Sequence, residues 1–98
     1  MYYYCIGYLY SETRNGIFHH LPVSSQVTND LETAKKWFED AVRVHTDSWR
    51  GNELLYVKDR KLDYMCMIKE ALFECNEAAY QKGFYSIELQ CYTHNPFA

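Results

Sequence analysis

This chain of 98 residues has little of several features that would indicate a function. It holds only four glycines and two prolines, too few for a glycine-rich phosphate loop or a proline-rich linker. No apolar run approaches the ~20 residues of a membrane-spanning helix, and the first residues lack the pattern of a secretory signal. The hydrolase and metalloprotease motifs G-x-S-x-G and H-E-x-x-H are also absent. We therefore expect a soluble cytoplasmic protein that is not an enzyme, with one compact domain over residues 1–98.

Closely spaced metal ligands are a further absence. The four cysteines are spread irregularly: Cys5, Cys66, Cys75 and Cys91. Neither C-x2-C nor H-x3-H spacing occurs, and the adjacent His19 and His20 would point to opposite faces of a strand. We therefore expect free thiols, no bound metal and no cofactor. Cys5 with His19 or His20 is the one conceivable pair of nucleophile and base, and no motif supports it.

What the chain has in excess is tyrosine at its start. Five of the first ten residues are tyrosine, and none of the ten carries a charged side chain. In an extended strand one side would carry Tyr2, Tyr4, Ile6, Tyr8 and Tyr10, and the other Tyr3, Cys5 and Leu9. The domain's own helices can cover one of these faces. The tyrosine-rich face left over is therefore a candidate partner surface, at Tyr2, Tyr4, Tyr8 and Tyr10, and a candidate site of self-association.

Turn and helix signals follow this strand. Asn15-Gly16 is a strong hairpin signal, which predicts a second strand from Ile17 to about Leu21. Asn29 followed by Glu32 has the form of a capping pair, and apolar residues then recur at helical spacing. The sequence therefore predicts a first helix from about Asp30 to His45.

The second half of the chain is predicted to hold two strands around a second helix. Glu53–Lys58 contains a short apolar run typical of a strand, and Tyr85–Cys91 alternates apolar and polar residues. Between them, Asp63 is a candidate cap for a helix with an apolar stripe at Tyr64, Ile68, Ala71, Leu72, Cys75 and Ala79. The alternative interpretation extends a hairpin through 62–67 and begins this helix at Ile68.

These elements predict an α+β fold with the order β-β-α-β-α-β. The economical packing is a four-stranded, mainly antiparallel sheet with both helices on one face and the other face open.

Two further features are candidate contacts for a protein partner. Trp49 lies in a polar connection between the first helix and the third strand, where a large indole is a typical interface anchor. Glu70, Glu74 and Glu77 fall at i, i+4 and i+7, which would align them along one side of the second helix. Such a line of carboxylates suits a basic groove on a partner.

The sequence therefore favours a non-enzymatic protein-binding module that forms a homodimer or higher oligomer. As a compact one-domain chain without motif or linker, it is comparable by analogy to small inhibitors that phages and mobile elements direct against host defence or regulatory complexes. One alternative is a nucleotide-like small-molecule binder with an aromatic pocket at an oligomer interface. Another is a single-stranded nucleic-acid binder, which the net charge of −3 and the uncharged tyrosine strand argue against.

Overall fold

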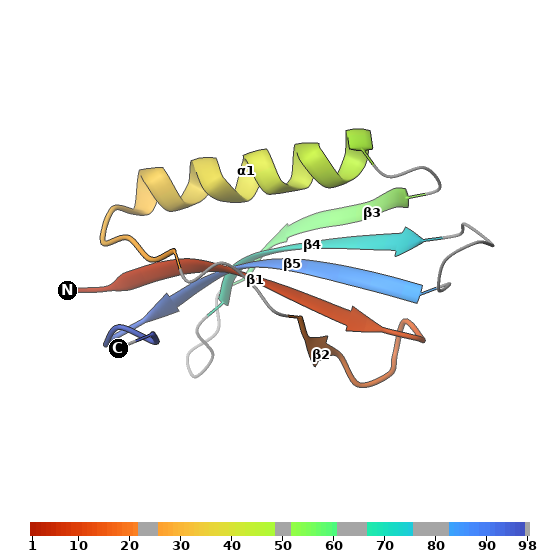
Figure 1. Ribbon diagram of the computed structural model, residues 1–98, viewed down its shortest axis with the longest axis horizontal. Coiled ribbons are helices and arrows are strands. Elements are labelled where there is room, and N and C mark those ends of the chain that lie inside the picture. Colours follow the sequence, from red (N-terminus) through yellow and green to blue (C-terminus); the bar gives the residue numbers. More distant parts are fainter. Residues whose placement is uncertain (22–25, 49–51, 61–66, 76–82, 98) are drawn as a thin grey trace.

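The computed structural model describes residues 1–21, 26–48, 52–60, 67–75 and 83–97, and in them α1 lies across one face of an antiparallel sheet (Figure 1). The elements in chain order are β1 (Tyr3–Ser11), β2 (His19–His20), α1 (Leu31–Ser48), β3 (Asn52–Asp59), β4 (Met67–Cys75) and β5 (Gly83–Tyr92). The strands are arranged β2-β1-β5-β4-β3, and every neighbouring pair is antiparallel. Because β2 has only two residues, the described fold is α+β with long elements in the order β-α-β-β-β.

The core lies between α1 and the sheet. Its fully buried side chains are Ala34 and Phe38 of α1, Ala71 and Phe73 of β4, and Ile87 and Leu89 of β5. Alternate positions on each strand supply these residues, as the two-residue period of a strand requires. Tyr4, Ile6 and Tyr8 of β1 are half-buried and pack against the same cluster. Burial of each large apolar side chain contributes roughly 1.5–3 kcal/mol, so this cluster is what holds α1 on the sheet.

The predicted first helix is confirmed, with different details at its ends. It ends at Ser48, beyond the predicted His45. At its start the Asp30 carbonyl accepts a hydrogen bond from the Ala34 amide at 3.1 Å, and the Thr33 hydroxyl donates to the Asp30 carboxylate at 2.6 Å. That hydroxyl holds the pKa of Asp30 below its ordinary value. No helix among the described residues is both long and apolar enough to cross a membrane.

The prediction of a second helix is wrong. Residues 67–75 form β4, which pairs with β3 on one side and β5 on the other. Ala71, Leu72, Phe73 and Cys75 are all buried, because this strand is covered on both of its faces. Ala71, Leu72 and Phe73 form a continuous apolar run between Glu70 and Glu74. The alternation of a strand is lost there, so the pattern is easily mistaken for the stripe of a helix. The alternative helix start at Ile68 is wrong for the same reason, and most of 62–67 lies outside the described residues.

The predicted hairpin after β1 is present in a reduced form. β2 covers only His19 and His20, which pair with Tyr10 and Leu9. The turn is closed by a hydrogen bond from the Gly16 amide to the Thr13 carbonyl at 3.1 Å, so Asn15 lies inside a wider loop. This loop lies on the side of the sheet away from α1 (Figure 1).

The face opposite α1 is partly covered, contrary to the expectation of an open face. Leu9 of β1, Leu72 of β4 and Ser86 of β5 point to this side and are buried. Phe18, from the loop between β1 and β2, lines a pocket together with them. The loop therefore packs over the middle of this face.

The outer sides of β1 and β3 differ in their backbone pairing. Along the outer side of β1, Tyr4 exchanges backbone hydrogen bonds of 2.7 and 3.0 Å with Thr28, and the Tyr8 carbonyl accepts one of 2.9 Å from the Leu21 amide. β2 then pairs with the end of β1. On the outer side of β3, no strand is present among the described residues.

Candidate functional site

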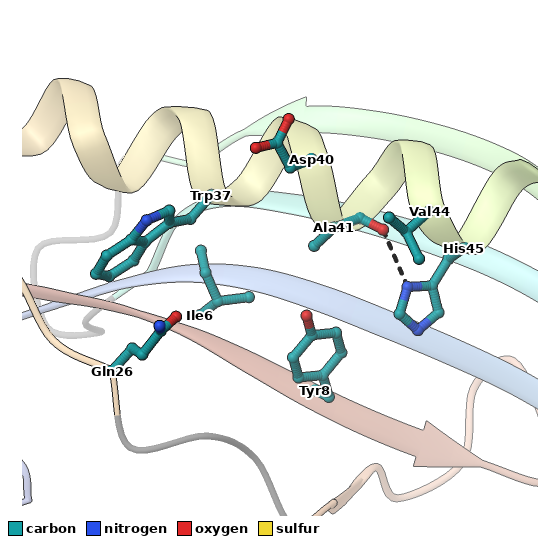
Figure 2. Close-up of a pocket in the computed structure, with 8 residues that line it drawn as sticks. All are labelled: Ile6, Tyr8, Gln26, Trp37, Asp40, Ala41, Val44 and His45. Carbon is teal, nitrogen blue, oxygen red and sulfur yellow. Dashed lines mark hydrogen bonds between the residues drawn. The ribbon is translucent and has the colours of Figure 1, made fainter.

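A concavity lies between α1 and β1 (Figure 2). We call it the β1–α1 pocket, and it is lined by Ile6, Tyr8, Gln26, Trp37, Asp40, Ala41, Val44 and His45. Its volume of about 290 Å³ is near the lower end for small-molecule sites. It can hold one aromatic ring or one large side chain.

Sequence periodicity explains why these residues meet. Trp37, Ala41, Val44 and His45 recur at helical intervals, so they form one flank of α1. Ile6 and Tyr8 alternate on β1 and point to the same face of the sheet. Figure 2 shows the Tyr8 hydroxyl pointing toward the helix and the Trp37 indole reaching toward Gln26. The helix supplies one wall, and β1 supplies the floor.

Aromatic contacts fix the inner end of the pocket. The rings of Tyr8 and His45 are stacked, with centroids 5.5 Å apart and an interplanar angle of 28°. His45 also lies 6.1 Å from Phe73 of the core. Its Nδ1 donates to the Ala41 carbonyl at 2.9 Å, since that oxygen only accepts. Burial raises the pKa of Tyr8, so its phenol stays protonated at neutral pH.

The rim of the pocket is more polar and more exposed. Asp40 is paired with Arg43 at 3.0 Å, and Gln26 is exposed. Val44 is 50% exposed although it lines the pocket. The pocket thus combines a rigid aromatic interior with an accessible apolar lip, an arrangement suited to an inserted side chain.

A second pocket lies on the opposite face of the sheet, with a volume of about 320 Å³. Glu70 is its central charge, and its carboxylate accepts hydrogen bonds from the Tyr56 hydroxyl at 2.7 Å and from Arg60 at 2.9 Å. Burial, followed by the bond to Glu70, raises the pKa of Tyr56. Glu88, directly opposite Glu70 across β4 and β5, accepts from Gln90 at 3.0 Å. Arg60 Nε and the Ser86 hydroxyl, which lines this pocket, are buried without a hydrogen-bond partner among the described residues. We interpret the bonded groups Tyr56, Arg60 and Glu70 as a structural network.

The structure separates the predicted partner-binding tyrosines. Tyr2 is exposed, and its ring lies 6.5 Å from that of Tyr4. Tyr4 and Tyr8 lie on the face under α1, and Tyr10 contacts Tyr85 on β5 at 5.2 Å. The tyrosine-rich side of β1 is thus the side that the helix covers in part, and the role of these residues in binding a partner stays a prediction.

The other predicted contacts fall elsewhere. Trp49 and Glu77 lie outside the described residues. Glu70 and Glu74 share one face of β4, opposite Lys58 and Glu53 of β3. They therefore do not form the acidic line on a helix that the sequence suggested.

The candidate metal and catalytic groups are not assembled in the described part of the chain. No cluster of three or more possible metal ligands occurs there. Cys5 pairs with Gln90, and His20 pairs with Leu9, four residues further along β1. That separation is about 13 Å along the strand, too far for a nucleophile and its base. No disulfide joins Cys5, Cys75 and Cys91 in the described part of the chain, and Cys66 lies outside it.

Sequence reasoning missed the β1–α1 pocket because Trp37 falls off the main apolar stripe of α1. A second stripe at Trp37, Ala41 and Val44 was the available signal, since a helix over a sheet can bury one flank beside its main face. Comparisons with protein families, with curated proteins and with solved structures find no match.

Proposed function

We propose that this protein is a non-enzymatic binding module that accepts an aromatic or aliphatic side chain of a protein partner in the β1–α1 pocket. The observation that carries the proposal is an aromatic interior next to an exposed apolar lip, formed by Tyr8, His45 and Val44 on rigid elements. Preformed pockets of this kind receive the anchor residues that dominate protein interfaces. By analogy of size alone, we propose that this binding inhibits a host defence or regulatory complex.

The chemistry of the pocket supports binding over catalysis. Asp40 is held by Arg43, and His45 is fixed by the Ala41 carbonyl and stacked on Tyr8. Among the described residues that line it, none is Ser, Cys, Thr or Lys. A Ser–His or Cys–His pair of nucleophile and base is therefore missing from this lining.

The test compares two exposed apolar residues on different surfaces. Val44→Glu places a charge on the lip of the pocket, whereas Ile17→Glu places the same charge on the loop after β1, where Ile17 is 81% exposed. Affinity capture from the native host should lose its principal protein with Val44→Glu and retain it with Ile17→Glu. Both variants must match the parent's thermal stability. Capture unaffected by Val44→Glu would contradict the pocket as the binding site.

A second candidate is a planar small molecule in the same pocket. The stacked pair of Tyr8 and His45, with Trp37 beside it, supports this alternative, since such rings suit stacking on a base. Native mass spectrometry of freshly purified protein tests it by the mass of any bound compound, and loss of that compound in Tyr8→Ala would locate it. Single-stranded nucleic acid has weaker support, because no Lys or Arg is among the described residues that line the pocket.

A further inference from the structure

β3 is an eight-residue strand at the edge of the sheet, and its sequence is complementary to itself. Read from Asn52 to Asp59 the strand is N-E-L-L-Y-V-K-D. If a second copy runs antiparallel to it about a point between Leu55 and Tyr56, Glu53 faces the second copy's Lys58. In the same register Leu54 faces Val57. Opposite charges and apolar side chains thus meet at equivalent positions on both sides of the centre.

A β-bulge makes this register possible. Between Leu54 and Tyr56 the pairing of β3 with β4 shifts, so that Leu54 pairs with Phe73 and Val57 with Ala71. Phe73 and Ala71 both face α1, and so Leu54 and Val57 share that face although three residues separate them. Residues directly opposite one another in an antiparallel pair must lie on the same face. Without the bulge, Leu54 and Val57 would point to opposite faces, and this pairing would fail.

The side chains concerned are exposed in the single chain. Leu54 and Val57 are 37% and 46% exposed, and Glu53 and Lys58 are exposed as well. Within the chain Glu53 lies opposite Glu74, a like charge, whereas Lys58 lies opposite Glu70 and over the ring of Tyr56 at 4.3 Å. Neither Glu53 nor Lys58 takes part in an ion pair among the described residues.

We infer that β3 is a homodimer interface, in which two copies join their sheets edge to edge about a twofold axis between Leu55 and Tyr56. Hydrogen bonds form on either side of the bulge, and two Glu53–Lys58 pairs close the ends of the interface. Bulges and lysines also occur on edge strands as protection against pairing. Protection alone does not need a glutamate at the position that mirrors the lysine, and this symmetry is what specifies a second copy as the occupant.

The test uses charge reversal and mixing. Two eight-residue strands form a small interface, so we expect a dissociation constant on the order of 10 μM for the parent, measured by sedimentation equilibrium. Glu53→Lys alone and Lys58→Glu alone each place like charges opposite one another, and each should dissociate at least tenfold more weakly. An equimolar mixture of the two variants presents only opposite charges across the interface. It should form a heterodimer with close to the parent's affinity.

Two readouts make the result decisive. Glu53→Lys removes the repulsion from Glu74, so its melting temperature as a monomer should equal or exceed the parent's while its dimerisation is lost. Hydrogen exchange of the parent alone should show protection of β3 amides that increases with protein concentration, with no such change in β1. A parent that is monomeric at millimolar concentration would overturn the inference. Dimers that persist in both single variants without preferential mixing would overturn it too.

Discussion

The β1 side and the β3 side of this sheet differ in how the outer backbone groups of the strand are hydrogen-bonded. On the β1 side, Thr28 and Leu21 hydrogen-bond the backbone of Tyr4 and Tyr8, and β2 pairs with the end of β1. On the β3 side, no described strand does so, and the side chains are exposed instead. An unpaired edge strand is a template for pairing with another chain. The inferred homodimer uses the edge whose outer backbone is not paired with a described strand.

The same contrast separates the two proposed surfaces. The β1–α1 pocket uses side chains on a closed edge, so a partner there meets an aromatic cavity and not free backbone. The β3 edge offers strand pairing. The two modes of binding occupy different parts of the molecule, and one chain can therefore use both together.

The largest expected effect comes from reopening the β1 edge. Thr28→Pro removes the amide that donates to the Tyr4 carbonyl at 3.0 Å. We expect the free energy of unfolding in urea to fall by about 2–3 kcal/mol, and we expect concentration-dependent association through the exposed β1.

Thr28→Ala is the matched control for that substitution. It keeps the backbone amide and loses only the side-chain oxygen that accepts from the Asp30 amide at 3.1 Å. Its free energy of unfolding in urea should fall by about 1 kcal/mol or less, and no new association should appear. Equal losses in the two variants would mean that the backbone bridge does not close this edge.

A smaller effect is expected from hydroxyl removal on the two sides of the sheet. Tyr56→Phe deletes the hydroxyl that donates to Glu70 at 2.7 Å, and we expect a loss of about 1 kcal/mol in urea denaturation. Tyr8→Phe deletes a hydroxyl that makes no hydrogen bond with the described residues, and we expect a change within roughly 0.5 kcal/mol. A larger loss in Tyr8→Phe than in Tyr56→Phe would contradict the assignment of Glu70 to a structural network.

Much of the fold could be predicted because most elements carry a clear period. β1, β3 and β5 coincide closely with the predicted strands, and α1 with the first predicted helix. β4 could not be predicted because Leu72 is buried on the face where Phe18, far away in the sequence, lines the same pocket. That burial removes the alternation that identifies a strand.

The candidate site could be predicted only in part. The sequence indicates that β1 has two apolar faces, but it does not indicate which face α1 covers. The structure places Tyr4 and Tyr8 on the covered face, where they are half-buried. Glu70 and Glu74 share a face in a strand as they would in a helix, because a spacing of four suits both periods. The environment of Glu70 depends on Tyr56 and Arg60, which the sequence does not connect to it.

The smallest expected effect is a loss of stability at high pH, to which tyrosines on both sides of the sheet contribute. Burial raises the pKa of Tyr8 near β1, and burial with the Glu70 bond raises that of Tyr56 on β3, each above the ordinary value of 10.0. Above about pH 10 the unfolded chain releases protons that the folded chain retains, so stability falls as pH rises and is unaffected below that point. Urea denaturation between about pH 8 and pH 11 should show this decline, with a shallower slope in Tyr56→Phe. A slope in Tyr56→Phe equal to the parent's would show that Tyr56 keeps its ordinary pKa and that its bond to Glu70 does not persist in solution.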